Sequence, residues 1–190
     1  MAQAKTLTPQ ELDKVLAYVS TKKYPERDRA LILTSCYSGL RVAEIASLKM
    51  GDVVNPDGTI KNEIRLSAEQ TKGKHPRTVF VSQRLQTELA TYLTTRHIKD
   101  QSIPFFHTDN RLGFTANGLC VWFHQLYKNV GISGGSSHSG RKFFITTLAN
   151  KGIGVRILAS LAGHRSIAVT QRYIEVNDEQ KRNAVELIQP

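Results

Sequence analysis

Apolar residues recur at three- and four-residue spacing along most of this chain, which is the period of an amphipathic helix. Thr8-Pro9-Gln10-Glu11 opens the first of these segments as a capping box with proline at the first helical position. Gly163 is placed to end one helix, and Ser166 to cap a short one that leaves Tyr173 near its far end. Besides that short helix, the predicted helices span about residues 9–19, 24–37, 41–48, 83–96, 115–131, 141–151, 155–162 and 178–188.

Two short strands are predicted at residues 63–66 and 78–81, with Ile60 shortly before them. Residues 70–77 form a basic hairpin tip between the strands. Residues 51–52 and 55–58 contain the glycine, aspartate, asparagine and proline that are typical of turns. The sequence therefore predicts a mainly α fold with a small antiparallel β-sheet, of the α+β class.

The length of 190 residues, with 40% hydrophobic and 22% charged residues, is typical of one globular domain. Residues 1–6 are expected to form a frayed, flexible tail. The 26 basic residues outnumber the 16 acidic ones, and the net charge of +10 favours a polyanionic partner. Because no long basic amphipathic helix stands out, nucleic acid is favoured over a membrane. An ordinary basic surface is the alternative.

Cys36 and Cys120 lie in apolar surroundings without C-x-x-C spacing, which predicts two small buried thiols in a reducing compartment. No apolar run approaches the length needed to cross a membrane, and residues 1–5 lack the apolar core of a signal peptide. A cytoplasmic protein is therefore expected. Nothing in the sequence resembles a carboxylate cluster for a metal ion.

Arg41 lies at the predicted N-terminus of a helix, where the helix dipole repels a cation. This position favours an anionic ligand shared between the guanidinium group and the helix amides. The alternative is a surface arginine held by a nearby carboxylate, and Glu44 is three residues away. Lys72 and Lys74 flank a glycine at the hairpin tip, which suits a loop that reaches a phosphate, although a solvated turn would look the same.

Tyr173 follows His164 by nine residues, and a phenol beside a histidine is a candidate nucleophile. Taken alone, a tyrosine in such a segment is more often an amphipathic packing residue. The interpretation of Tyr173 therefore depends on which other motifs the chain contains.

Five motifs occur in a fixed order along the chain. They are Ser38-Gly39-Leu40-Arg41-Val42-Ala43-Glu44, then Thr71-Lys72-Gly73-Lys74 with Arg77-Thr78-Val79, then His138-x-x-Arg141, Ala162-Gly163-His164 and Tyr173. In order, spacing and local structure, residues 7–177 resemble the catalytic domain of the tyrosine recombinase (phage integrase) family. They are similar to short single-domain members such as the fimbrial-switch invertases and to the catalytic domain of Xer-type recombinases.

The resemblance implies that the chain cuts DNA by transesterification and that Tyr173 becomes a 3′-phosphotyrosine. Because the bond energy is conserved in that intermediate, neither ATP nor a metal is required. Negative charge builds on two non-bridging phosphate oxygens, and positioning and electrostatics supply most of the catalysis. Arg41 and Arg141 are the candidates that clamp these oxygens in bidentate fashion, as lysine cannot.

The same resemblance assigns the proton transfers. The attacking phenol has an ordinary pKa of about 10 and needs help to lose its proton. His138 is the candidate that assists this deprotonation, while His164 donates a hydrogen bond to a phosphate oxygen. Lys72 delivers a proton to the leaving 5′-oxygen, and Lys74 is the alternative for this role.

Other residues near the motifs are expected to assist, with Glu44 as a structural residue. The residues predicted to support DNA binding are Lys74, Arg77, Lys142, Arg165 and Arg172. The chain departs from the family pattern at Gly140 and Lys142, where leucine and histidine are frequent, and at Ala162, where leucine is usual. Four histidines match no motif and are expected on the surface or in the core: His75, His97, His107 and His124.

The resemblance divides the chain into a catalytic domain at residues 7–177 and a C-terminal helix or tail at residues 178–190. That helix is expected either to dock on a neighbouring subunit or to pack on its own core. Most family members carry an N-terminal helical domain that clamps the other face of DNA. That domain is absent from this sequence, as it would be in an excised fragment or in a minimal recombinase.

The leading functional hypothesis is a site-specific recombinase that integrates, excises or inverts double-stranded DNA. Members of the family usually work as a tetramer on two DNA sites, and accessory DNA-bending proteins are further possible partners. The alternatives are a type IB topoisomerase-like nicking-closing enzyme and a catalytically silent DNA-binding regulator. Tyr173 is expected to be displaced from Arg41 and Arg141 without DNA, and a hydrogen bond from Tyr173 to both arginines would contradict this.

Overall fold

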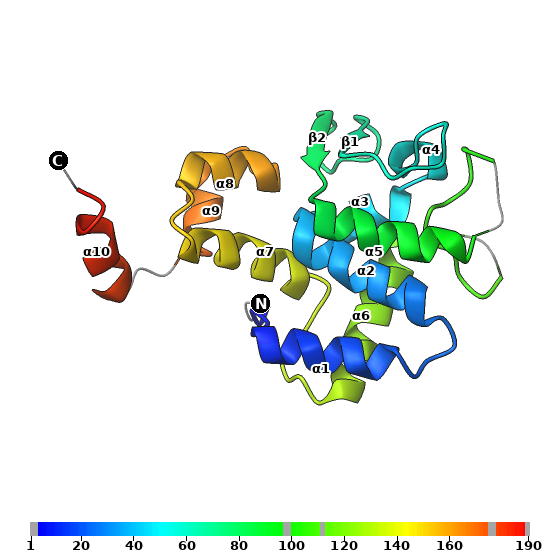
Figure 1. Ribbon diagram of the computed structural model, residues 1–190, viewed down its shortest axis with the longest axis horizontal. Coiled ribbons are helices and arrows are strands. Elements are labelled where there is room, and N and C mark those ends of the chain that lie inside the picture. The colour runs from blue at the N-terminus through cyan, green and yellow to red at the C-terminus, as the bar shows by residue number, and fades with distance from the viewer. Residues whose placement is uncertain (1–3, 97–99, 111–112, 175–177, 189–190) are drawn as a thin grey trace.

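The computed structural model describes residues 4–96, 100–110, 113–174 and 178–188 (Figure 1). In this part of the chain the fold is mainly helical with a small two-stranded antiparallel sheet, so the predicted fold class is confirmed. The helices are α1 (Pro9–Val19), α2 (Pro25–Ser38), α3 (Val42–Ser47), α4 (Met50–Val53), α5 (Gln83–Thr94), α6 (Ala116–Val130), α7 (Ser139–Asn150), α8 (Val155–Ala162), α9 (Ile167–Gln171) and α10 (Asp178–Val185). The strands are β1 (Glu63–Leu66) and β2 (Arg77–Phe80).

The first helix begins at the predicted capping box. Thr8 Oγ1 accepts a hydrogen bond from the Glu11 backbone N–H at 3.1 Å, and the Glu11 carboxylate accepts one from the Thr8 N–H at 3.0 Å. Residues 4–6, expected to be part of a frayed tail, are held in the structure. The Lys5 N–H donates to the carbonyl of Gly134, and the Lys5 ammonium pairs with Glu11. The rest of the expected tail, residues 1–3, lies outside the described residues.

Helix α2 lies at the centre of the fold and buries polar as well as apolar side chains. Residues 30–36 are all buried. Helices α1, α3, α5 and α7 contact it from different sides. Gly39 ends α2 in the left-handed conformation with φ of 63°, which glycine adopts at little cost. The chain then leads directly into Arg41 and α3.

The predicted hairpin forms with β1 antiparallel to β2 and Ile64 paired with Val79. Both of these side chains are buried, so one face of the small sheet belongs to the core. Strand β2 begins one residue earlier than predicted, at Arg77, and Ile60 pairs with Val54 in an isolated bridge. The expected turn at residues 51–52 is instead the single helical turn α4, which Asp52 stabilises by accepting the Lys49 N–H at 2.8 Å.

Helices α8, α9 and α10 lie beyond α7 and away from α2 (Figure 1). Gly163 ends α8 with φ of 62°, as predicted. Ser166 occupies the N-cap position of α9, but its side chain makes no capping hydrogen bond. Helix α10 stands apart from the other helices in Figure 1, and its segment exposes Val185, Leu187 and Ile188. These apolar side chains therefore do not pack on the core of their own chain.

Both cysteines are free thiols, as predicted. Cys36 is buried in α2, and this burial raises the pKa of its thiol to about 12. Cys120 is only half-buried, and its sulfur lies 3.4 Å from the hydroxyl of Ser137. Among the described residues, no helix has the length and apolar character required to span a membrane.

Candidate active site

Arg41 immediately precedes α3 and is held by Glu44 in the first turn of that helix. The Glu44 carboxylate accepts hydrogen bonds from the Arg41 backbone N–H at 2.7 Å and from its Nη1 at 3.0 Å. The Glu44 side chain is 1% exposed, whereas that of Arg41 is 27% exposed. The sequence left open whether Arg41 binds an anionic ligand or is held by a nearby carboxylate, and the structure is compatible with both. A carboxylate holds the arginine, and the guanidinium group still lines a cavity that is open to an anion.

Three arginines from distant parts of the sequence converge on consecutive carbonyl groups at the end of α8. The guanidinium-to-carbonyl pairs are Arg77 to Leu161 at 3.1 Å, Arg141 to Ala162 at 2.5 Å, and Arg41 to Gly163 at 2.9 Å. The last carbonyls of a helix lack intrahelical partners and lie at the negative end of its dipole, so they attract cations. These contacts fix all three arginines relative to His164, the next residue in the chain.

Gly163 is required at this junction for two reasons. Its φ of 62° is a left-handed conformation that side chains rarely adopt. A Cβ atom at this position would also lie 2.7 Å from Cδ and 2.9 Å from Nε of Arg77. The glycine therefore lets the guanidinium group pass directly beneath the turn that leads to His164.

Arg141 is the most buried of the three arginines, at 4% exposure. Besides Ala162, its guanidinium group donates to the carbonyl of Gly39, the glycine that ends α2. Burial, followed by the positive charge of Arg41, lowers the pKa of the Arg141 guanidinium. Two guanidinium groups in such proximity gain electrostatically from a bound anion.

Glu44 links two of the arginines, because its carboxylate also accepts from Arg77 Nη2 at 2.7 Å and Nε at 3.3 Å. Burial alone would raise the pKa of Glu44, but the hydrogen bonds and charges of Arg77 and Arg41 outweigh it and lower the pKa. Glu44 is thus ionised at neutral pH. We call Arg41, Arg77, Arg141 and Glu44 the arginine cluster. Three guanidinium groups against one carboxylate leave an excess of two positive charges, which suits a phosphate diester.

Both candidate histidines lie next to this cluster and are neutral near pH 7. His164 has its pKa lowered to about 4 by partial burial and then by Arg141, Arg41 and Arg77. His138 is the N-cap residue of α7, and partial desolvation together with Arg141, Lys72 and Arg41 lowers its pKa. A neutral imidazole can accept a proton, which is what assisting the deprotonation of a phenol requires.

Tyr173 lies beyond the end of α9, and its ring stacks on that of His164 with centroids 5.8 Å apart and an interplanar angle of 22°. Its backbone N–H donates to the Thr170 carbonyl at 2.9 Å. Among the described residues its phenol makes no hydrogen bond to Arg41 or Arg141. A hydrogen bond from Tyr173 to both arginines would have contradicted the expected displacement of Tyr173, and no such bond is present there. The tyrosine ring nevertheless lies beside the arginine cluster.

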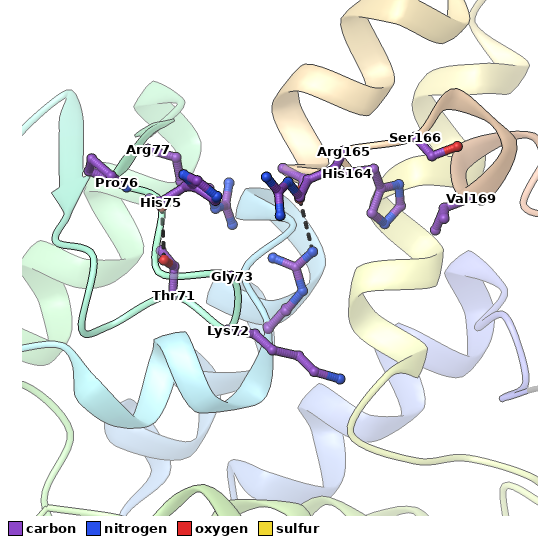
Figure 2. A pocket seen from close by; sticks show the side chains of 12 residues that line it. Thr71, Lys72, Gly73, His75, Pro76, Arg77, His164, Arg165, Ser166 and Val169 are labelled. Carbon is purple, nitrogen blue, oxygen red and sulfur yellow. Dashed lines mark hydrogen bonds between the residues drawn. The ribbon is translucent and has the colours of Figure 1, made fainter.

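Lys72 lines a cavity of about 540 Å³ between the hairpin and the residues that join α8 to α9 (Figure 2). Figure 2 shows the hairpin side chains on one side of this cavity and His164 on the other. The Lys72 side chain is exposed, and among the described residues its ammonium has no hydrogen-bonding partner. Lys74 is exposed, does not line the cavity and has a φ of 50°. Of the two lysines considered for proton donation, Lys72 is thus the one that lines the cavity.

The residues expected to support DNA binding divide into two groups. Lys74, Arg165 and Arg172 are exposed, and Arg165 also lines the cavity, so their positions agree with phosphate contacts. Arg77 belongs to the arginine cluster, with a side chain only 12% exposed. Lys142 donates to the carbonyl of Ala4 at 3.1 Å. DNA contacts by any of these residues remain predictions.

Two polar residues near the site had no predicted role. His75 lines the cavity from the hairpin, although its sequence position matches no motif. Thr170 is completely buried, and its hydroxyl lies 2.9 Å from Nδ1 of His164. The only sequence signal for Thr170 was a polar residue inside the short helix that leads to Tyr173.

The remaining unmatched histidines lie away from the site as far as the structure describes them. His124 is exposed on α6, and Nδ1 of His107 lies 2.9 Å from the Tyr92 hydroxyl. His97 is outside the described residues. Within the described part of the chain, no group of three or more His, Cys, Asp or Glu side chains is arranged to hold a metal ion.

The sequence of this chain matches the family model of the phage integrase family over residues 5–180. The chain belongs to the phage integrase family. The match includes the arginine cluster, both histidines, the hairpin and Tyr173. The resemblance read from five short motifs is therefore confirmed over nearly the whole chain.

Similar phage integrase family members include Xer recombinases. Tyrosine recombinase XerA of Pyrococcus furiosus is 31% identical over 185 residues, which cover 96% of this chain and 61% of that protein. Tyrosine recombinase XerD of Chlamydia pneumoniae is 30% identical over 182 residues, which cover 90% of this chain and 57% of that protein. This chain thus spans only about three fifths of the length of these relatives.

Solved structures of the phage integrase family share the fold. The crystal structure of XerA recombinase has a TM-score of 0.77 and 24% identity, covering 100% of this chain and 67% of that one. The catalytic domain of bacteriophage HP1 integrase has a TM-score of 0.68 and 21% identity, covering 98% of this chain and 96% of that one. The expected tyrosine recombinase catalytic-domain fold is therefore confirmed.

The departures from the phage integrase pattern around Arg141 have local explanations. Gly140 packs against α2, where a Cβ atom would lie 2.2 Å from the hydroxyl oxygen of Ser35. This close approach lets α7 carry Arg141 to the end of α2. Lys142 ties the N-terminal segment to α7 through Ala4. Ala162 is fully buried, so its small side chain is accommodated in the core while its carbonyl binds Arg141.

Proposed function

We propose that this chain is the catalytic part of a site-specific DNA recombinase that cuts and rejoins double-stranded DNA through a 3′-phosphotyrosine. The observation that carries this proposal is the convergence of Arg41 and Arg141 on the end of α8, with Tyr173 stacked on His164 beside them. Two guanidinium groups with an excess of positive charge provide the site for a phosphate diester, and the phenol lies next to it.

In the cleavage step, Tyr173 Oη attacks the phosphorus and the bond between phosphorus and the 5′-oxygen breaks. The phenol proton passes to neutral His138, and the leaving 5′-oxygen takes a proton from Lys72. Arg41 and Arg141 stabilise the charge that develops on the non-bridging oxygens. Rejoining is the reverse attack by a 5′-hydroxyl on the phosphotyrosine, so the number of phosphodiester bonds is unchanged.

The relatives support DNA as the partner. A solved relative, the Tn1549 transposon integrase in complex with transposon right end DNA, has a TM-score of 0.73 and 19% identity, and covers 99% of this chain and 67% of that one. The net charge of +10 and the exposed Arg165 and Arg172 agree with a polyanionic ligand. A protein that neutralises several phosphates loses affinity steeply as salt rises.

The proposal is tested with a pool of nicked suicide duplexes whose central sequences are randomised. Cleavage next to the nick releases a short fragment and traps the protein on DNA as an SDS-resistant adduct. The wild-type protein is expected to form the adduct and the Tyr173→Phe variant to form none. Tyr18→Phe, which alters a half-buried tyrosine on α1, is the matched control and should form the adduct normally.

The outcomes separate the three functional classes. Trapped sequences that share a motif, followed by strand exchange between two copies of that motif, support the recombinase. Relaxation of supercoiled plasmid without exchanged products indicates a nicking-closing enzyme. DNA binding without any adduct indicates a regulator and overturns the proposal.

We further propose that the active form is a homo-oligomer, a tetramer on two DNA sites, held in part by the C-terminal helix. The segment of α10 exposes Val185, Leu187 and Ile188 at 61%, 84% and 82%. Burying these side chains in a second copy would remove apolar surface from water. Light scattering of the protein on its DNA should show assemblies that the double variant Leu187→Asp, Ile188→Asp cannot form. Equal masses for both proteins would contradict this.

A further inference from the structure

Helix α9 buries its threonine and exposes its apolar residues, which reverses the ordinary pattern of a surface helix. Thr170 is 0% exposed, whereas Ile167 and Val169 are 38% and 37% exposed. A buried hydroxyl costs stability unless it forms a hydrogen bond. The position of Thr170 therefore requires a specific partner.

The partner is Nδ1 of His164, 2.9 Å from Oγ1 of Thr170. Among the described residues, the hydroxyl has no other hydrogen-bonding partner. If Nδ1 carried the imidazole proton, the hydroxyl proton of Thr170 would be buried with no acceptor in that part of the chain, which would destabilise the fold. Thr170 therefore donates and Nδ1 accepts. In a neutral imidazole the single proton then lies on Nε2.

We propose that Thr170 is a positioning residue that holds His164 in the Nε2–H tautomer, so that the ring offers a hydrogen-bond donor to a non-bridging phosphate oxygen. This inference rests on the proposed function of the site. His164 lines the same cavity as Arg41 and Lys72, which places its ring where a phosphate would bind (Figure 2). With the opposite tautomer, Nε2 would present a lone pair that repels the phosphate oxygen.

The neutrality of His164 makes the tautomer decisive. Partial burial and the charges of Arg141, Arg41 and Arg77 lower its pKa to about 4, so near pH 7 the ring carries a single proton. An imidazolium ion would donate from both nitrogens and would not need Thr170 to select between them. A neutral ring donates to phosphate only if its one proton is on the correct nitrogen.

Thr170 also connects His164 with the proposed nucleophile. Its backbone carbonyl accepts the N–H of Tyr173 at 2.9 Å, while the two rings stack. One buried residue thus orients the imidazole with its hydroxyl and fixes the turn before Tyr173 with its backbone. Substitutions that keep the shape of Thr170 separate these two contributions, because they leave the backbone contact in place.

The first measurement is long-range proton–nitrogen NMR of the wild-type protein without DNA. It reads directly which ring nitrogen of His164 is protonated. We expect the Nε2–H tautomer in the wild type and in Thr170→Ser, which keeps the hydroxyl. In Thr170→Val, which keeps the shape and removes the donor, we expect a mixture of both tautomers. A wild-type ring protonated on Nδ1 would overturn the inference.

The second measurement is the single-turnover rate at which the protein cleaves a nicked suicide duplex. The dissociation constant for DNA is measured in parallel. In metal sites, loss of the residue that orients a ligating histidine typically costs about 10–100-fold in activity or metal affinity, and we take the same range for His164. We expect this loss in Thr170→Val, with the dissociation constant unchanged within about two-fold, and recovery of most of the rate in Thr170→Ser. The matched control is Thr34→Val. It removes a buried hydroxyl in α2 that has no partner among the described residues, and it should cleave at the wild-type rate.

If Thr170→Val cleaves at the wild-type rate, the tautomer of His164 does not matter for cleavage, and the catalytic half of the inference is overturned. If the wild-type protein forms no adduct with any duplex, the proposed function fails and that half fails with it. The tautomer, which is measured without DNA, still decides whether Thr170 positions His164. The two failures are therefore distinguishable.

Discussion

The arginine cluster and the hairpin that carries Lys72 differ in how firmly the fold holds them. Arg41, Arg77 and Arg141 each bind a backbone carbonyl at the end of α8, and Glu44 links two of them. Lys72 is exposed at the hairpin tip and has no hydrogen-bonding partner among the described residues. The guanidinium groups of the arginine cluster are therefore held in place by the fold, whereas the ammonium group of Lys72, the proposed proton donor, is not.

This difference matches the chemistry assigned to each region. Stabilising the charge of a transition state requires donors that are already oriented, because reorienting them during the reaction would cost energy. A proton donor needs only to reach its oxygen once the DNA is in place. We infer that the cluster is preformed without DNA and that the hairpin completes the site when DNA binds.

The most damaging change is expected in the cluster. Arg141→Lys replaces a buried guanidinium group that reaches the carbonyls of Gly39 and Ala162 with an ammonium group that cannot reproduce this pair of contacts. Cleavage in a single turnover should fall about 10³-fold, as happens when a preorganised donor is lost. Arg84→Lys, on an exposed arginine of α5, is the control and should cleave normally. A loss of less than ten-fold would mean that the cluster does not bind the reacting phosphate.

A smaller effect is expected at the hairpin. Lys72→Ala should slow cleavage about 10²-fold, the lower end of the range for a general acid. A substrate with sulfur in place of the 5′-oxygen should restore the rate, because a thiolate leaves without a proton.

Lys74→Ala is the matched variant for this test. It should weaken DNA binding and its salt dependence while leaving the chemical step and the sulfur effect as in the wild type. Rescue of Lys74→Ala by the sulfur substrate, with no rescue of Lys72→Ala, would reverse the assignment of the two lysines.

The contribution of Glu44 to stability tests whether the cluster is truly preformed. Glu44→Gln should lower the free energy of unfolding by about 2 kcal/mol near pH 7, because it leaves two partly buried guanidinium groups without their buried carboxylate. The control is Glu88→Gln, which breaks a partly exposed pair with Arg29 and should cost less than about 1 kcal/mol. Urea unfolding measures both values.

The same variant gives a pH dependence of known sign. The folded-state pKa of Glu44 is lowered from its ordinary value of 4.5, so the stabilisation is present above that value and is lost as the pH falls through the folded-state pKa. The difference between the wild type and Glu44→Gln should therefore shrink as the pH falls from neutral to below 4.5. A difference that stays constant with pH would show that Glu44 acts by packing and not by charge.

The smallest effect is expected at the exposed rim of the cavity. Arg165→Ala should weaken DNA binding a few-fold and reduce the slope of log affinity against log salt by about 0.9, the value for one phosphate contact. Lys22→Ala, on the loop after α1, provides a comparison with the same change of charge. If both variants change the slope equally, Arg165 makes no specific contact.

Much of the site was predictable because its motifs combine residue type with local geometry. The capping box at Thr8 and the left-handed Gly163 follow from local sequence alone. Arg41 and Glu44 are one helical turn apart, so their contact also follows from spacing. These features depend only on residues that are close together in the sequence, so they can be predicted from it directly.

Contacts between distant residues were not predictable in the same way. Arg77 was expected to support DNA binding, but its guanidinium group binds Glu44 and the carbonyl of Leu161. Thr170 was assigned no role, although its hydroxyl is buried against His164. Nothing in a residue's type tells which of several acceptors it will meet once helices pack. The turn expected at residues 51–52 became the helix α4 because Asp52 caps its first turn.

The sequence by itself determined the family, the order of the helices and the types of groups that carry the chemistry, because periodicity, caps and motif spacing are local. Only the tertiary structure decided that three arginines would meet consecutive carbonyls at the end of one helix. It also decided that one buried carboxylate would link two of them and that a buried threonine would orient His164. Burial and charge at that junction come from residues separated by up to 122 positions, and only packing brings them together.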